Sequence, residues 1–471
     1  MISGARSKWN LDPDLEFACL LAKNGPNGET GDETEMTLVN RRTALKLGLA
    51  GGALLATAPT TLAQLRIVVE GANFQPLPIA IPDFASSDPS FGREIAEIVR
   101  NNLRRSGLFL PLDPASLPLQ VGDVNATPDF NVWRTANVDA LVMGSVERGG
   151  QVSASVRVWD TQQASQVVGN SYATDPNSSR RIAHQVSDAI YAQLSGGTGY
   201  FDTRVVYVAE SGPKANRTRR LAIMDQDGAN VSYLTDGSSM ALTPRFSPNG
   251  DMLTYMNFAD GNPQVYLLQL STGRQQRLAS VGAMTFAPRF SPDGGTVAFS
   301  VEQGGATNIY SVSTGGGQPS QLTTGAAIDT GPSYSADGSR LVFESDRGGS
   351  PQIYMMGAGG GNPQRISYGQ GSYSTPVWSP SGDLIAFTRQ SGGQFHIGVM
   401  SPDGSGERLL YSGYHAEGPT WAPNGRVIMF FQDPGGNDGP RLMSVDIWGR
   451  STQTIPTESY ASDPAWSGLR S

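Results

Sequence analysis

Short apolar runs recur at a fixed spacing through the second half of the chain. Each run is rich in β-branched and aromatic residues and is flanked by Gly, Asp or Asn, which is typical of strands joined by tight turns. These runs occupy residues 253–257, 297–301, 341–345, 385–389 and 428–432. A further strand pattern follows the first three, with Tyr266, Tyr310 and Tyr354 in equivalent places. The pattern predicts an all-β region built from repeated sets of strands.

One seven-residue phrase precedes each of these runs. It reads PRFSPNG at residues 244–250 and PRFSPDG at residues 288–294, and variants begin at Pro332, Pro376 and Pro419, with a truncated form at Pro464. The successive steps are 44, 44, 44, 43 and 45 residues. Units of about four short strands at this period are typical of β-propeller blades.

The phrase itself has a structural explanation. Its aromatic residue lies on a strand, so six aromatics at one phase predict a layer buried between blades. These aromatics are Phe246, Phe290, Tyr334, Trp378, Trp421 and Trp466. The Ser-Pro-Asp/Asn-Gly part is typical of a turn, because Pro fixes φ, Asp or Asn bonds nearby backbone and Gly adopts a positive φ. We therefore expect the phrase to determine the fold and not to carry catalysis.

The number of blades follows from the number of phrases. One additional strand set, at residues 205–210, 220–225 and 231–236, precedes the first phrase, and the truncated phrase ends the chain. We expect the last strand to pair with the strand near residue 205, which would close a ring over residues 201–471 and remove its exposed sheet edges. The prediction is a six-bladed β-propeller.

Residues 64–200 lack this period. Apolar positions at helical spacing predict amphipathic helices over residues 91–109 and 178–196. Strand patterns occur at residues 65–71 and 77–84, and on both sides of a Gly-Gly turn near residue 150. The predicted fold class is thus an α+β N-terminal domain followed by an all-β six-bladed β-propeller.

A basic stretch, an apolar run and a small-residue end follow one another over residues 36–63. This order is typical of a secretory signal peptide, with cleavage after Ala63, so we expect the chain to be exported. The stretch NRRTALK resembles a twin-arginine signal, but Ala44 stands where a large apolar residue is expected, and the Sec route stays open. Residues 1–35 have the wrong charge for a leader, so we expect translation to begin at Met36.

Composition excludes several function classes. The formal net charge of −8 disfavours nucleic-acid binding, which needs Lys/Arg patches against phosphates. The single cysteine, Cys19, precedes the predicted cleavage site, so the exported chain has no disulfide or thiol nucleophile. The 57 glycines and 31 prolines suit many short strands, and the exported part has no apolar run of membrane length.

The sequence shows no catalytic arrangement. No Ser has Gly at both the −2 and +2 positions, so the nucleophile elbow of hydrolases is missing. His184, His396 and His415 lack metal-ligand spacing, and the Gly-rich stretches lie between predicted strands, unlike a phosphate loop. We expect a binding protein without catalytic residues, cofactor or predicted metal site. A propeller hydrolase and a ligand-binding propeller remain the alternatives.

The order of signal peptide, α+β domain and six blades carrying PxW/FSPDG resembles the TolB family of the Tol–Pal cell-envelope system. The resemblance covers residues 64–471, from the strand beginning QLRIVVEG to the terminal PAWS, while residues 1–35 depart from the family pattern. It implies a monomeric, non-enzymatic periplasmic docking protein that supports outer-membrane integrity and constriction during cell division. It also implies two partners, the peptidoglycan-associated lipoprotein Pal and the inner-membrane protein TolA.

The positions of these contacts can be predicted from the repeat. The segment before each repeat proline leads into an innermost strand, so it should lie around one mouth of the channel, and it varies from blade to blade. The candidate Pal contacts in these segments are Met284, Ala287, Asp329, Thr330, Tyr373, Thr375, His415 and Glu417. The resemblance implies that TolA contacts the start of the exported chain, at Gln64, Leu65, Arg66, Ile67, Val68, Val69 and Glu70. A switch of this segment between free and docked states would couple the two binding events.

Overall fold

The computed structural model describes residues 65–67, 74–118, 123–259, 261–279 and 281–470. Residues 64–471 form one compact unit. The predicted upstream extension and signal peptide lie outside the described residues, as do four of the predicted TolA contacts, Gln64, Val68, Val69 and Glu70.

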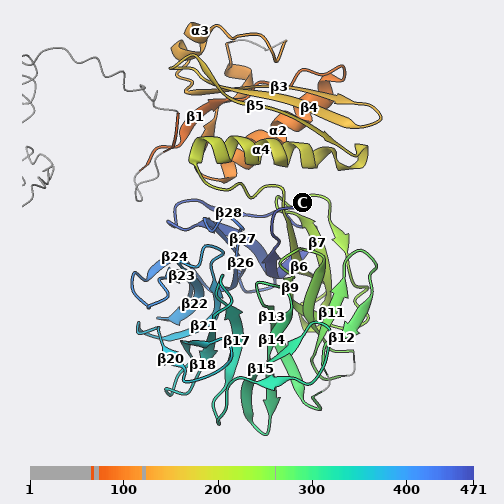
Figure 1. The fold of residues 1–471 in the computed structure, drawn as a ribbon, viewed down its shortest axis with the longest axis vertical. Coiled ribbons are helices and arrows are strands. Elements are labelled where there is room, and N and C mark those ends of the chain that lie inside the picture. Colours follow the sequence, from red (N-terminus) through yellow and green to blue (C-terminus); the bar gives the residue numbers. More distant parts are fainter. Residues whose placement is uncertain (1–64, 68–73, 119–122, 260, 280, 471) are drawn as a thin grey trace, which may run out of the picture. The chain divides into compact units, whose positions relative to one another are not determined.

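The N-terminal domain contains a five-stranded sheet and two long helices (Figure 1). Its strands are β1 (Leu77–Ala80), β2 (Phe109–Pro111), β3 (Ala140–Arg148), β4 (Val152–Asp160) and β5 (Ser165–Thr174). Its helices are α2 (Pro89–Arg105), α3 (Phe130–Thr135) and α4 (Ser179–Ser195), with 3-10 turns η1 (Pro114–Ser116) and η2 (Pro176–Ser178). The sheet order is β2-β1-β3-β4-β5, with β1 parallel to both of its neighbours. Because α2 and α4 contact the sheet and each other, they cover the same face of it.

Both predicted helices are present, and their ends have local causes. The Asp88 carboxylate accepts hydrogen bonds from the N–H groups of Ser90 (3.0 Å) and Phe91 (3.3 Å), which caps the start of α2. Gly196 ends α4 with a left-handed φ of 68°. The caps place the helix boundaries within about four residues of the sequence prediction.

The strand predictions before residue 85 were only partly right. The described residues 65–67 of the predicted first strand form no strand, and β1 ends at Ala80 although the pattern extended to residue 84. Pro82 has no N–H to donate to a ladder, which favours an early end to this strand. The short strand β2, the edge strand β5 and the helix α3 were not predicted.

Six four-stranded antiparallel sheets follow, which confirms the predicted propeller (Figure 1). Five of them are consecutive in sequence. From the innermost to the outermost strand they are β9 (Ala241–Phe246), β10 (Met252–Asn257), β11 (Gln264–Gln269) and β12 (Gln275–Arg277); β13 (Met284–Phe290), β14 (Thr296–Gln303), β15 (Ala306–Ser313) and β16 (Ser320–Gln321); β17 (Asp329–Tyr334), β18 (Arg340–Ser345), β19 (Gln352–Gly357) and β20 (Gln364–Arg365); β21 (Ser372–Trp378), β22 (Ile385–Ser391), β23 (Gln394–Met400) and β24 (Arg408–Gly413); and β25 (His415–Trp421), β26 (Val427–Asp433), β27 (Arg441–Asp446) and β28 (Thr452–Thr454).

The sixth sheet closes the ring with strands from both ends of the repeat region. It consists of β29 (Tyr460–Trp466), β6 (Arg204–Ser211), β7 (Thr218–Asp225) and β8 (Ser232–Tyr233), with a 3-10 turn η3 (Lys214–Asn216). In the β29–β6 ladder, Trp466 lies opposite Val205, as the sequence predicted. This closure pairs β29 and β6, which would otherwise be unpaired ends of the repeat region.

The predicted aromatic layer lies between the blades. Four of its six members are buried, namely Phe290, Trp378, Trp421 and Trp466, while Phe246 and Tyr334 are half-buried. The indole N–H of Trp421 donates to the carbonyl of Val377 in the preceding blade at 2.9 Å. The aromatic residue at the same place in each repeat thus packs between neighbouring sheets.

Candidate partner-binding site

Each innermost strand of the propeller bulges immediately before its repeat proline. The ladder between the innermost strand and the next strand shifts register there in all six blades. The residue before the proline has a positive φ in every blade: Thr243 (48°), Ala287 (50°), Gly331 (62°), Thr375 (47°), Gly418 (68°) and Asp463 (48°). A bulge redirects side chains out of the regular alternation of a strand, and here it does so six times around one axis.

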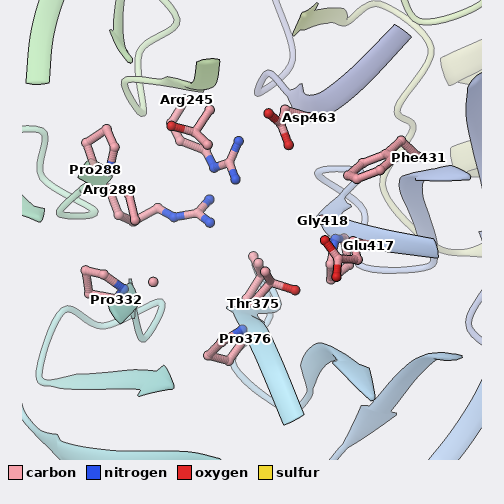
Figure 2. A pocket seen from close by; sticks show the side chains of 15 residues that line it. Arg245, Pro288, Arg289, Pro332, Thr375, Pro376, Glu417, Gly418, Phe431 and Asp463 are labelled. Atoms are coloured by element: carbon pink, nitrogen blue, oxygen red, sulfur yellow. The ribbon is translucent and has the colours of Figure 1, made fainter. Parts of the chain in front are cut away.

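These six residues line a common cavity of about 120 Å³, which we call the channel cavity (Figure 2). Four repeat prolines complete its wall, together with side chains from the inner strands. The further lining side chains are Arg245, Arg289, Val377, Glu417 and Phe431.

Charged side chains of both signs line the channel cavity. Arg245 and Arg289, the arginine pair, point into it from β9 and β13. Asp463 of the neighbouring strand β29 lies beside Arg245, and Glu417 lies across the cavity; we call these two carboxylates the acidic wall (Figure 2). Burial holds the pKa of Arg289 well below its usual value, and the charge of Arg245 lowers it further. Burial raises the pKa of Asp463, and Arg245 partly opposes that shift. The cavity is therefore a poorly solvated site in which ionised groups are costly unless paired.

Glu344 of β18 adds a further titratable group beside the acidic wall. Burial raises the pKa of Glu344 to about 7, against the effect of a hydrogen bond from the Thr375 N–H. The negative charges of Glu417 and Asp346 act in the same direction as burial. Near neutral pH this carboxyl is therefore close to half protonated.

Three of the predicted Pal contacts meet in the channel cavity. Ala287, Thr375 and Glu417 come from three different blades, and all three line its wall. The Thr375 hydroxyl also lies 2.8 Å from that of Thr388, which fixes its rotamer. These residues are thus brought together although 130 positions separate the first from the last.

His415 lies next to this group at the start of β25. Its ring contacts the rings of Phe395 and Phe431, with centroids 4.9 and 5.5 Å away, and its Nε2 is 3.6 Å from a Glu417 carboxylate oxygen. It lines a second cavity of about 330 Å³ that shares Phe431 and Asp463 with the channel cavity. The two cavities therefore adjoin each other at Phe431 and Asp463.

The other candidates are placed differently. Asp329 and Tyr373 are fully buried: the Asp329 carboxylate accepts from Arg347 at 2.8 Å, and the Tyr373 hydroxyl donates to Glu407 at 2.8 Å. Their side chains can affect a partner only by supporting neighbouring groups. The Thr330 hydroxyl is half-buried and accepts from Ser300 at 3.2 Å, and Met284 lines a separate cavity of about 490 Å³.

Large apolar side chains are exposed at the same end of the innermost strands. We call Met240, Ile328, Tyr414 and Tyr460 the rim; each immediately precedes an innermost strand or is its first residue. Ile328 is 48% exposed and Tyr414 is 69% exposed. Exposed apolar residues gathered at one mouth of a channel are typical of a protein-binding surface.

The sequence analysis missed both the rim and the arginine pair. The signal for the arginines was available, because the residue after the repeat proline is Arg in only two phrases and is uncharged in the other four. An interpretation of the phrase as purely structural does not use this difference between the repeats. Met240, Ile328 and Tyr460 begin segments that precede a repeat proline, and Tyr414 lies one residue before such a segment, but the pattern does not show which of these side chains are exposed.

Three residues of the predicted TolA segment are described, and they lie against α4. The Ile67 N–H donates to the Leu194 carbonyl at 2.7 Å, and the side chains of Leu65 and Ile67 pack on the domain core. Arg66 is exposed beside Gly196. One backbone hydrogen bond and two half-buried side chains hold these residues.

One group of side chains has the composition of a metal site. His184, Asp225 and Asp227 place ligand atoms within 4.8 Å of one another. Arg180 already pairs with both carboxylates in this group, so a cation would have to displace a guanidinium. We therefore assign no metal to it.

Comparison with known proteins identifies the family. Residues 191–470 match the family model of the TolB beta propeller domain, and residues 65–167 match that of the TolB amino-terminal domain. The chain belongs to the TolB family. Membership assigns it a role in the Tol–Pal system, as a TolB-type propeller without a known enzymatic activity.

Solved structures of TolB proteins are similar to this chain. TolB from Acinetobacter baumannii is 27% identical with a TM-score of 0.76, over 86% of this chain and 100% of that one. A putative TolB from Agrobacterium tumefaciens is 22% identical with a TM-score of 0.44, over 54% of this chain and 89% of that one. TolB homologues are periplasmic, and no helix in the described part of this TolB-family chain is long and apolar enough to span a membrane.

Proposed function

We propose that this TolB-family chain is a monomeric, non-enzymatic docking protein of the periplasm. It binds Pal at the channel mouth and TolA through the start of the exported chain, and it thereby supports outer-membrane integrity and constriction during division. The observation that carries the proposal is the rim of exposed apolar side chains around a charged cavity. A central apolar contact surrounded by polar groups is the usual composition of a protein interface.

The N-terminal contacts support a two-state role for residues 64–70. In the described residues 65–67, a release from α4 would break the hydrogen bond from Ile67 to Leu194 and expose the half-buried side chains of Leu65 and Ile67. TolA would then bind the released segment, and the segment would be unavailable to TolA while it lies on α4. This is the coupling that the family resemblance implies.

The double variant Ile328→Asp with Tyr414→Asp tests the Pal contact. Each change places a charge where a partner would bury an apolar side chain, so we expect the affinity for the soluble domain of Pal to fall at least about tenfold. Isothermal titration calorimetry with the exported chain measures this. Leu409→Asp is the matched control, because Leu409 is equally an exposed apolar residue but lies on the outermost strand β24.

Unchanged affinity in the double variant would contradict the proposal. Equal losses in the double variant and in Leu409→Asp would indicate a general effect on folding or charge. Co-purification of only small ligands from intact cells would favour a ligand-binding propeller instead.

A further inference from the structure

The arginine pair is not required by the propeller fold. Arg245 and Arg289 each follow a repeat proline, and the four equivalent residues are Ser333, Val377, Thr420 and Ala465. All six positions form the same bulged innermost strand. A small uncharged residue therefore suffices for this backbone, and the two arginines need another explanation.

The two guanidinium groups lack ionic partners. Among the described residues, neither Arg245 nor Arg289 is in an ion pair. Arg245 donates one hydrogen bond, to the carbonyl of its neighbour Pro244 at 2.7 Å, and the buried Nε of Arg289 has no hydrogen-bond partner. Burying an unpaired cation is unfavourable, so the two arginines lack an anionic partner that would stabilise them.

The acidic wall does not supply an ion-pair partner for the arginine pair. Asp463 lies beside Arg245, where burial lowers the pKa of Arg245 and the charge of Asp463 raises it, but the two side chains are not within ion-pair distance (Figure 2). Glu417 lies across the cavity, and its carboxylate is 3.6 Å from His415. The channel cavity of about 120 Å³ thus holds both arginines without a direct ion pair.

We propose that the arginine pair is a carboxylate-binding subsite that receives an Asp or Glu side chain of the protein docked on the rim. Planar guanidinium groups bind carboxylates through paired N–H donors, and two of them converging on one cavity favour a single anionic group. The cavity at His415 adjoins the channel cavity at Phe431 and Asp463, so we expect the side chain to enter from this side. This inference rests on the proposed docking function for the source of the carboxylate.

The subsite can be tested without a partner. In the exported chain, sodium acetate should shift the Arg Nε–Hε NMR resonances of Arg245 and Arg289 saturably, whereas sodium chloride at equal ionic strength should not. The variant Arg245→Met should remove the response of Arg289. Equal responses to acetate and chloride would overturn the carboxylate assignment.

The partner is tested with the double variant Arg245→Met and Arg289→Met. We expect at least a tenfold loss of affinity for the soluble domain of Pal, partial recovery in the double Lys variant, and no loss in Arg274→Met, an exposed arginine far from the channel. The melting temperature of the double Met variant should not fall, because the change removes two half-buried charges that make no ion pair.

The outcomes separate the two proposals. If wild type binds Pal and the double Met variant binds it equally well, the subsite is wrong and docking stands. If wild type binds no Pal, the docking proposal fails, and the acetate titration alone decides whether the arginine pair binds a carboxylate.

Discussion

The residue before each repeat proline has a left-handed backbone in all six blades, yet it is Gly in only two of them. A non-Gly residue in this conformation is strained by about 1 to 3 kcal/mol. Gly331 and Gly418 show that the bulge tolerates the residue that would relieve this strain. Thr243, Ala287 and Thr375 therefore keep their side chains at a cost in stability, and all three line the channel cavity.

Glu344→Gln tests the electrostatics of this cavity. Burial raises the pKa of Glu344 from 4.5 to about 7, so the folded chain retains a proton that the unfolded chain loses, and stability falls as pH rises through this range. The variant cannot ionise. We expect its free energy of unfolding at pH 8, relative to wild type, to exceed that at pH 4.5 by about 1 to 3 kcal/mol.

Urea denaturation of both proteins at the two pH values measures this difference. Glu302→Gln, at an end of β14 outside the channel cavity, serves as the matched control. A stability difference between Glu344→Gln and wild type that stays constant from pH 4.5 to pH 8 would contradict the assignment.

At the residue scale, the repeat predicted part of the site. Variation before the repeat proline identified Ala287, Thr375 and Glu417, which do line the channel cavity. The same reasoning also selected Asp329 and Tyr373, whose side chains are buried. The bulge explains the difference, because it interrupts the two-residue alternation from which side-chain direction is inferred.

At the scale of elements, strong periodicity predicted well, and short strands did not. The apolar stripes of α2 and α4 predicted both helices, while the Asp88 cap at the start of α2 and Gly196 at the end of α4 were not used in that prediction. The outermost strands have only two or three residues in five of the six blades. Two or three residues are too few to show an alternation of apolar and polar positions, so only pairing in the folded sheet determines these strands.

The link between α4 and β6 is a structured element that the sequence pattern treated as a boundary. The Asp188 carboxylate accepts from the N–H groups of Phe201 (2.7 Å) and Asp202 (2.9 Å). The ring of Tyr200 packs between those of Tyr191 and Trp466, at 5.8 Å from each. The last helix of the N-terminal domain is therefore bonded to the chain that enters the propeller.

Deletion of residues 64–70 tests the N-terminal segment as an element. If this segment is the TolA contact, the shortened chain should lose TolA binding by more than about tenfold in a calorimetric titration, while Pal binding is retained. Leu110→Asp is the control, since Leu110 is an exposed apolar residue of the N-terminal domain on β2. Intact TolA binding after the deletion would contradict the assignment.

At the scale of the whole molecule, the period of the sequence determined the architecture. Counting phrases gave the number of blades, and the truncated last phrase showed which strand must pair with β6. Counting could not reveal the chemistry of the channel, because the cavity is formed by one to four residues from each of six blades. Charged residues that are far apart in the sequence line one cavity only after the ring has closed.

The central claim is that the channel mouth docks Pal, and site-specific photocrosslinking in intact cells tests it most directly. A photoreactive residue at His415 lies at the start of an innermost strand, and one at Leu409 lies on the outermost strand β24. We predict a covalent adduct with Pal from position 415 and none from position 409. No Pal adduct at 415, or equal adducts at both positions, would contradict the account.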